Sequence, residues 1–307
     1  MPTPRQTVSF LMQRFAEVGL QPNTRHGQNF LIDLNLVALL ADAAAITADD
    51  VVLEVGTGTG SLTALLAQHA AAVVTVELDR HLHQLARESL VDCPNVVMLQ
   101  QDALKNKNQF HPRVLEAVRL ELGKAPGRRL KLAANLPYSV ATPVISNLLA
   151  TDLVPASMTA TIQKELAERI TAVPGTRDYG ALSIWIQSQC RTQIIRILPP
   201  DVFWPRPKVE SAIVQIVPEA ERRARIPDLS FFHSFVRAMF FHRRKLLRSE
   251  LVSAFRNELD KPAVDAVLAE RGLSPTARAE ELDADVMLAL SEAVRRRLTV
   301  ADGSPRA

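Results

Sequence analysis

The sequence predicts an α/β protein with a Rossmann-like, mainly parallel sheet that includes one antiparallel strand, followed by a small all-α domain. Three observations predict this fold. Short β-branched runs alternate with stretches of helical periodicity through the first two thirds of the chain. Two later strand candidates are separated only by a loop, and beyond Val217 the pattern becomes helical throughout.

Five strand candidates have the spacing expected of a parallel sheet that helices cover on both faces. They are Val51 to Val55, Val73 to Glu77, Val96 to Gln100, Leu130 to Ala134 and Met158 to Gln163. Two more candidates, Gln193 to Leu198 and Ala212 to Val217, are joined by DVFWPRPKVES. This link is too short for a helical crossover, so it indicates an antiparallel pair.

A domain boundary is expected near Pro218. Residues 1–217 would form the α/β domain, and residues 218–307 a small helical domain with a flexible tail after Thr299. Several apolar residues of the second region recur at helical spacing and are expected on one helix face. They are Phe232, Phe235, Val236, Met239 and Leu246.

Composition and charge restrict the class of protein. The chain has 307 residues, of which 47% are hydrophobic, and a net charge of +3, as expected of a globular protein. The longest stretch without charge, Leu132 to Thr151, contains Asn135, Pro137 and Pro143, so we expect no membrane span. The N-terminus lacks the pattern of a secretory signal, which favours a cytoplasmic protein.

Neither a disulfide framework nor a metal site is expected. The two cysteines, Cys93 and Cys190, lie in apolar segments and are interpreted as core residues. His81 and His83 are two residues apart on a predicted helix, so their side chains face different directions and make a poor pair of metal ligands.

A glycine-rich turn follows the first strand directly, in VVLEVGTGTGSLTALLA. Strand, glycine turn and helix in this order let a ligand approach bare backbone at the carboxyl end of a strand. A dinucleotide site would want a third small residue of the pattern one position beyond Gly60, and the spacing here is G-x-G-x-G instead. Glu54, just before the turn, suits a ligand with positive charge, and S-adenosylmethionine is such a ligand.

Two further acids end neighbouring strands. Glu77 lies at the end of the second strand, about twenty residues after the turn, where it could bind ribose hydroxyls. Asp102 follows the third strand and could accept a hydrogen bond from an adenine amine. Because the carboxyl ends of parallel strands meet at one edge of a sheet, we expect these acids around one site.

The fourth strand leads into Asn135-Leu136-Pro137-Tyr138. An amide oxygen and a backbone carbonyl can accept both hydrogens of an exocyclic amine, while the proline fixes the backbone and the tyrosine offers a face for stacking. Such hydrogen bonds would draw the amine lone pair of an adenine out of the ring and toward a methyl donor. The motif therefore favours a pocket for an extruded adenine, and the alternative is a strand-ending turn over a core tyrosine.

Basic residues are concentrated in the last third of the chain. The group considered for RNA binding comprises Arg243, Arg244, Lys245 and Arg248. A solvated helix face explains this run as well as an RNA-binding surface does.

With these motifs in place, the chain resembles the rRNA small-subunit adenine N6,N6-dimethyltransferases of the KsgA type, which are class I S-adenosylmethionine-dependent methyltransferases. The similarity is collinear over nearly the whole chain. Its motifs are HGQNFLID, EVGTGTGSL, VELD, QQDAL, NLPY, QKELAERI, FWPRPKVES and FFHRRKLLR. The resemblance implies methyl transfer to two adjacent adenines in a 3′-terminal hairpin loop of 16S rRNA during ribosome biogenesis.

The resemblance also implies the site residues and partners. The cofactor contacts would be Asn29, Leu31, Gly56, Glu77, Asp102 and Asn135. The target base would be held by Asn135, Leu136, Pro137, Tyr138 and the opposing stacking wall Phe203. Residues 1–217 would be the catalytic domain, and the helical domain would help to bind rRNA through the basic group. The expected partners are small-subunit rRNA and the immature small ribosomal subunit, and the protein is expected to be a monomer.

The chain departs from the family pattern in three places. Thr57 replaces the usual proline after the first glycine, Ser139-Val140-Ala141 replaces Asn-Ile-Ser, and the segment Lys105 to Arg129 is longer than typical. Three alternatives stay open. A large-subunit rRNA adenine methyltransferase of the antibiotic-resistance type usually has isoleucine at Leu136, a DNA adenine methyltransferase usually has proline there, and a ribosome-assembly factor could have lost activity.

Overall fold

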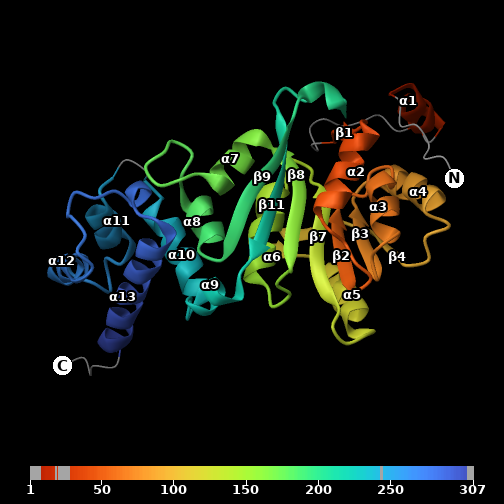
Figure 1. Ribbon diagram of the computed structural model, residues 1–307. Helices are drawn as coiled ribbons and strands as arrows, with labels where there is room; N and C mark the ends of the chain where they lie inside the picture. Colours follow the sequence, from red (N-terminus) through yellow and green to blue (C-terminus); the bar gives the residue numbers. More distant parts are fainter. Residues whose placement is uncertain (1–7, 18, 20–27, 243–244, 303–307) are drawn as a thin grey trace. The chain divides into compact units, whose positions relative to one another are not determined.

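The computed structural model describes residues 8–17, 19, 28–242 and 245–302 of the 307-residue chain (Figure 1). The chain divides into two compact units. One contains residues 1–167 and 192–218, and the other contains residues 168–191 and 219–307. Within the described residues, the structure contains no helix of sufficient length and apolarity to cross a membrane.

The first unit is built on a seven-stranded sheet with the strand order β4-β3-β2-β7-β8-β11-β9. Its strands are β2 (Asp50–Val55), β3 (Ala72–Glu77), β4 (Val96–Gln100), β7 (Arg129–Asn135), β8 (Ser157–Gln163), β9 (Cys190–Leu198) and β11 (Ser211–Pro218). The pairs from β4 to β8 are parallel, and β11 is antiparallel to β8. The predicted fold class is therefore confirmed, and each strand candidate forms a strand.

Helices and short strands complete the first unit, and Figure 1 shows α3 and α4 beside β2, β3 and β4. The helices are α1 (Val8–Glu17), α2 (Leu34–Ala43), α3 (Ser61–Ala67), α4 (Arg80–Ser89), α5 (Pro112–Gly123), α6 (Ala141–Ala150) and α7 (Lys164–Thr171), which continues into the second unit. The short elements are β1 (Phe30–Leu31), β5 (Leu104–Asn106), β6 (Gln109–Phe110), β10 (Phe203–Trp204) and the 3₁₀ turn Pro200–Val202. The segment from Lys105 to Arg129 thus contains most of a β5–β6 hairpin and helix α5.

The central strands are apolar on both faces because helices cover both. Every residue of β2 and β3 is buried. On one face α2 and α3 pack over the sheet, and this core cluster includes Val37, Leu40, Leu62, Leu66, Val52, Val73, Ala133 and Ile213. Helix α4 begins at a side-chain cap where the chain leaves β3, because Asp79 accepts hydrogen bonds from the backbone N–H groups of His81 and Leu82. The strand ends are therefore held in place by a packed core.

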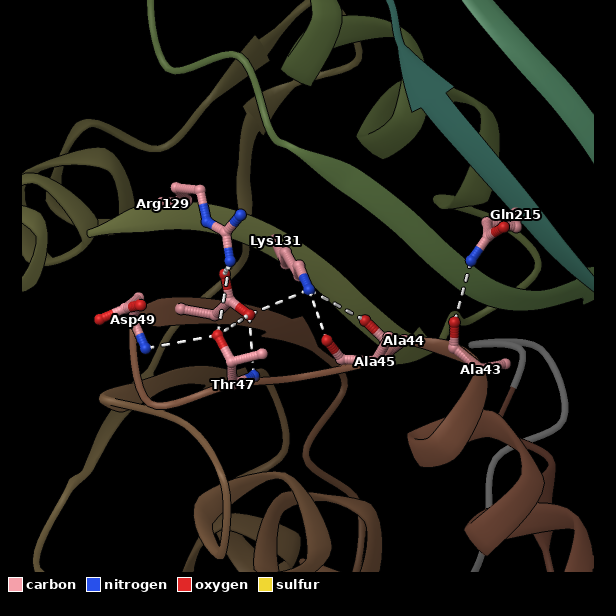
Figure 2. A network of polar contacts seen from close by, with 9 residues as sticks. Ala43, Ala44, Ala45, Thr47, Asp49, Arg129, Lys131 and Gln215 are labelled. Atoms are coloured by element: carbon pink, nitrogen blue, oxygen red, sulfur yellow. Dashed lines mark hydrogen bonds and ion pairs between the residues drawn. The ribbon is translucent and has the colours of Figure 1, made fainter. Parts of the chain in front are cut away.

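A polar network joins β2 and β7 at their amino-terminal ends (Figure 2). Asp50 is fully buried and pairs with Lys131, with 2.9 Å between Nζ and Oδ2. Arg129 pairs with the other carboxylate oxygen at 3.1 Å. Lys131 also donates to the carbonyls of Ala44 and Ala45, where α2 ends. The buried charges are thus compensated, as burial requires.

The second unit is helical. Its helices are α8 (Ala181–Gln187), α9 (Ala220–Ala224), α10 (Leu229–Met239), α11 (Leu247–Ala254), α12 (Lys261–Glu270) and α13 (Ala284–Asp302), with a 3₁₀ turn at Ala279–Glu281. Helix α10 packs against α8, α11 and α13. Four of the five residues predicted on one face of a helix are buried in α10, namely Phe232, Phe235, Val236 and Met239. The prediction is wrong for Leu246, which is 36% exposed, because α10 ends at Met239.

Candidate active site

A cavity of about 830 Å³ lies at the carboxyl ends of β2, β3, β4 and β7. Seven of the predicted site residues line it: Asn29, Leu31, Gly56, Glu77, Asp102, Asn135 and Pro137. Leu136, Tyr138 and Phe203 do not line it. The topology explains why so many line one cavity, because parallel strands deliver their following loops to one edge of the sheet.

The glycine turn and the Asn-Leu-Pro-Tyr motif touch each other at Gly56. This residue has φ of +88°, which favours glycine, and a Cβ built on it would lie 3.2 Å from Cδ of Pro137. Its backbone N–H donates to the carbonyl of Val76 at 2.9 Å. Gly56 is therefore required both for the turn and for the close approach of Pro137.

Glu77 connects the second strand to the same turn. Its carboxylate accepts hydrogen bonds from the backbone N–H of Gly58 at 2.9 Å and of Asp79 at 3.0 Å. Burial raises the pKa of Glu77, although these two hydrogen bonds act in the opposite direction. The carboxylate is thus held at the cavity wall, and each oxygen keeps a lone pair for a ligand hydroxyl.

Glu54 lies beneath the turn in a chain of hydroxyl groups. Thr63 and Thr75 each donate to Glu54 Oε2 at 2.6 Å, and the Thr57 hydroxyl lies 2.6 Å from that of Thr75. Burial raises the pKa of Glu54 to about 8, against these hydrogen bonds and with the help of the nearby Glu77. Without a ligand Glu54 is therefore mainly protonated at neutral pH, and a neighbouring positive charge would favour its carboxylate.

Asp102 is exposed at the mouth of the cavity, in the loop after β4. Its Oδ1 accepts a hydrogen bond from the backbone N–H of Leu104 at 2.9 Å, which orients the side chain. This arrangement leaves a carboxylate edge that a base amine could reach.

Asn135 ends β7, and its side-chain amide donates to the backbone carbonyl of Asn29 at 3.0 Å. This hydrogen bond directs the amide nitrogen toward the N-terminal segment, so the amide oxygen is the group that can accept from a target amine. Leu136 is buried, and its N–H donates to the carbonyl of Thr161 at 3.1 Å. These two hydrogen bonds therefore hold the end of β7 and the Asn135 side chain in place.

Tyr138 and Phe203 have different surroundings. The Tyr138 hydroxyl lies 2.6 Å from that of Ser211, the first residue of β11, and burial raises the pKa of Tyr138. Phe203 is 2% exposed and lies in the core cluster, where its backbone pairs with Leu31. Phe203 is therefore a core residue in this structure and does not line the cavity.

Sequence reasoning missed the hydroxyl chain of Thr57, Thr63 and Thr75. In the sequence Thr57 stands out only as a departure from the family's proline, and in the structure its hydroxyl lies 2.6 Å from that of Thr75, a contact that a proline could not make. A threonine inside the apolar strand AVVTVE is the one signal that could have indicated a polar network there. In such strands threonine is also common for its shape alone, so that signal is weak.

The basic group predicted for RNA binding is only partly described. Arg243 and Arg244 lie outside the described residues. Lys245 is exposed. Arg248 binds Asp265 with two hydrogen bonds, one of them 2.8 Å between Nη2 and Oδ2. Its charge is therefore already compensated on the surface of the helical unit.

The residues that line the cavity fit S-adenosylmethionine. The volume is in the range of small-molecule sites, about 300 to 1,000 Å³. Buried acids adjoin bare glycine backbone in its wall, as a cation with ribose hydroxyls requires. Among the described residues, no group of three or more histidines, cysteines and acids could hold a metal ion. Fold and cavity together define a class I S-adenosylmethionine-dependent methyltransferase.

The comparison with known proteins identifies the family. Residues 19–295 match the family described as Ribosomal RNA adenine dimethylase, and the chain belongs to this family. Among curated relatives, Ribosomal RNA small subunit methyltransferase A of Halothermothrix orenii is 37% identical over 90% of this chain and 89% of its own. The protein of the same name from Pediococcus pentosaceus is 40% identical over 86% of each chain. Enzymes of this family use S-adenosylmethionine as methyl donor.

Solved structures agree with the fold. A dimethyladenosine transferase from Plasmodium falciparum has a TM-score of 0.71 at 23% identity, covering 86% of this chain and 96% of its own. The 23S rRNA methyltransferase ErmE has a TM-score of 0.61 at 24% identity, covering 87% and 100%. At these identities the two structures indicate a shared fold, which includes the helical region after the sheet.

Proposed function

We propose that the protein transfers methyl groups from S-adenosylmethionine to the N6 amines of two adjacent adenines in a 3′-terminal hairpin loop of 16S rRNA. The name of the curated relatives, which specifies the small subunit, supports this substrate. The observation that carries the proposal is the end of β7, where Asn135 lines the cofactor cavity and its amide nitrogen is held by the Asn29 carbonyl, which leaves the amide oxygen as an acceptor.

The chemistry follows from the groups at this strand end. When bound, S-adenosylmethionine supplies an electrophilic methyl group. The Asn135 amide oxygen and the Leu136 carbonyl accept the two hydrogens of the adenine amine and orient its lone pair toward that methyl group. Pro137 restricts the backbone between them, and Tyr138 offers its ring to the base. The alkylated amine is strongly acidic and loses its proton to water, so a general base with a shifted pKa is not needed.

The remaining roles are proposals about single residues. Asn29, Leu31, Gly56, Glu77 and Asp102 hold the cofactor. Phe203 stacks on the target base only if the β10 segment shifts when RNA binds, because its ring is 2% exposed. Lys245, with Arg243, Arg244 and Arg248, contributes to rRNA binding. We further infer a monomer that acts in the cytoplasm on the immature small subunit, with catalysis in residues 1–217 and rRNA binding in residues 218–307.

Mapping of methylated nucleotides tests the proposed function. Small-subunit rRNA from a deletion strain is expected to lack methylation at two adjacent adenines, and the wild-type gene is expected to restore it. Methylation that is missing instead from large-subunit rRNA would favour the antibiotic-resistance type, and unchanged methylation of both would favour a non-catalytic assembly factor.

Replacement of Asn135 tests the site. The Asn135→Ala variant is expected to lose transfer of labelled methyl groups to unmethylated small subunits, because one acceptor for the amine is gone, while RNA binding persists. Equal activity of variant and wild type would remove Asn135 from the site.

A further inference from the structure

A loop of the first unit carries two cations that the site described above does not use. It comprises residues 205–210, PRPKVE, and connects β10 to β11. Arg206 and Lys208 in this loop are both exposed. Among the residues that the structure describes, neither has an acidic partner. Two uncompensated charges so close together on one short loop favour an anionic ligand.

Both ends of this loop are attached to the active site. Before the loop, Trp204 pairs with Phe30 of β1. The Phe30 ring lies against the glycine turn, 3.5 Å from where a Cβ on Gly58 would be. After the loop, Ser211 is hydrogen-bonded to the Tyr138 hydroxyl at 2.6 Å. The residues on both sides of the loop are therefore joined to the site, Trp204 through the segment against the glycine turn and Ser211 through the tyrosine of the Asn-Leu-Pro-Tyr motif.

The acid of the loop does not cancel these charges. Glu210 forms an ion pair with Lys164, 2.6 Å between Oε2 and Nζ, and its carbonyl accepts from the Lys164 backbone N–H at 3.0 Å. The charges of Glu210 and Lys164 compensate each other, and the two contacts attach the end of the loop to the start of α7. Arg206 and Lys208 therefore give the loop two positive charges that its own acid does not compensate.

Two prolines alternate with the cations. Pro205 and Pro207 lock their own φ angles and restrict the residues before them. A loop with less conformational freedom loses less entropy when its side chains are ordered by a ligand. The loop is thus suited to hold charges at a defined place beside the pocket.

We propose that Arg206 and Lys208 bind the phosphates that flank the target adenine in the RNA. This inference rests on the proposed function, because it takes RNA as the substrate. A base turned out of its stack leaves its neighbouring phosphates at the mouth of the pocket. Cations there position the strand without reading its sequence, and a guanidinium suits a phosphate especially well.

The test is RNA binding at several salt concentrations. The probe is a fluorescently labelled RNA hairpin with two adjacent adenines in its loop, and the variant carries Arg206→Ala and Lys208→Ala together. The variant is expected to bind more weakly, with a salt slope in log affinity that is smaller by about 1.4 to 1.8, since each phosphate contact contributes about 0.7 to 0.9. S-adenosylmethionine affinity and thermal stability are expected to be unchanged.

A matched control separates local contact from net charge. Arg119→Ala with Lys124→Ala also removes two exposed cations, but these are paired with Asp152 and Glu121. The control is expected to keep the wild-type affinity and salt slope. The exchange Arg206→Lys with Lys208→Arg keeps both charges and is expected to keep most of the slope. An equal decrease of RNA affinity and salt slope in the control, or no decrease in the alanine variant, would overturn the inference.

Methyl transfer to unmethylated small subunits separates this inference from the proposed function. The alanine variant is expected to raise KM for subunits while kcat is largely retained. Wild-type activity with an unchanged KM and salt slope in the variant would contradict the phosphate contacts and leave the proposed function standing. If the wild type itself does not methylate small subunits, the proposed function fails, and hairpin binding still decides the role of the loop.

Discussion

At the scale of single residues, Gly56 shows how the absence of a side chain couples two parts of the site. Its φ of +88° is needed for the turn, and its open face admits Pro137. Gly127 has a similar φ of +82°, but a Cβ built on it would meet nothing within 4 Å. The two glycines therefore share the conformational requirement, and only Gly56 has the close contact as well.

The two glycines are expected to respond differently to replacement by alanine. Gly127→Ala is expected to cost about 1 to 2 kcal/mol of stability through its left-handed conformation alone and to keep its activity. Gly56→Ala has the same conformational cost and also displaces Pro137, so we expect S-adenosylmethionine binding to weaken by at least about tenfold, or about 1.4 kcal/mol, and kcat to fall. Titration calorimetry and methyl-transfer kinetics measure both effects. Similar behaviour of the two variants would contradict a role for the Pro137 contact.

At the scale of elements, β2 carries a buried acid near each end. The pKa of Asp50 is lowered from its ordinary value, and the pKa of Glu54 is raised. Burial alone would raise the pKa of Asp50, but hydrogen bonds from Lys131 and Thr47 outweigh it and hold the pKa below its ordinary value of 3.8. Glu54 has only hydroxyl donors, so burial dominates and the pKa rises to about 8. The amino end of the strand is therefore an ionic anchor, and the carboxyl end responds to charge in the cavity.

The ionic anchor predicts a loss of stability in Lys131→Met. Removing one partner of a buried pair should lower the free energy of unfolding by about 3 kcal/mol at pH 7. Because the folded-state pKa of Asp50 is lowered, the stabilisation is present above about pH 5 and is lost as the pH falls through that pKa. Urea unfolding from pH 7 downward measures the difference, and the surface variant Arg119→Ala should lose no more than about 1 kcal/mol.

The raised pKa of Glu54 predicts that binding of the cofactor releases a proton from this side chain. Its raised pKa means that the empty site holds the proton near pH 7 and that stability falls as the pH rises from about 4.5 to about 8. A cationic ligand beside Glu54 favours the carboxylate, so S-adenosylmethionine should release up to about one proton. Calorimetry in buffers of different ionisation enthalpy measures the number of protons released per cofactor bound. Glu54→Gln should abolish the release, and an unchanged count would assign the proton to another group such as Glu77.

At the scale of the whole molecule, the chain crosses between its two units more than once. Residues 168–191 belong with the helical region after Pro218, and they supply part of its core. Trp185 is 2% exposed with its ring 6.4 Å from that of Phe232, and the hydroxyl of the buried Tyr179 donates to the carbonyl of Leu282 at 3.0 Å. The helical unit is therefore built from two separate stretches of chain.

Because residues 168–191 pack with the helical region after Pro218, we expect a chain that ends at residue 217 to be unstable. Trp185 and Tyr179 would lose the residues that bury them, so we expect red-shifted tryptophan fluorescence and a broadened unfolding transition. A control chain ending at residue 302 should unfold like the full-length protein. Cooperative unfolding of the shorter chain, with unshifted fluorescence, would support a boundary at residue 218 as the sequence alone suggests.

Local patterns determined much of this protein. Period and spacing are local properties, so the parallel strands, the antiparallel pair and the glycine turn could be read from the sequence. Topology then placed Glu77, Asp102 and Asn135 around one cavity, because parallel strands share a carboxyl edge. The family followed from motifs such as GQNFL and NLPY in their order.

Only the tertiary structure decided which partner each polar or aromatic group has. The sequence showed Glu54 as an acid before a turn, and the fold buried it against the hydroxyls of Thr63 in α3 and Thr75 in β3. Phe203 became a core residue because β10 pairs with β1, about 170 residues earlier. Such contacts depend on which distant segments pack together, and no local pattern encodes them. The sequence by itself therefore determined the fold class and the family chemistry, and the packing determined the protonation of Glu54 and the anchoring of the loop that carries Arg206.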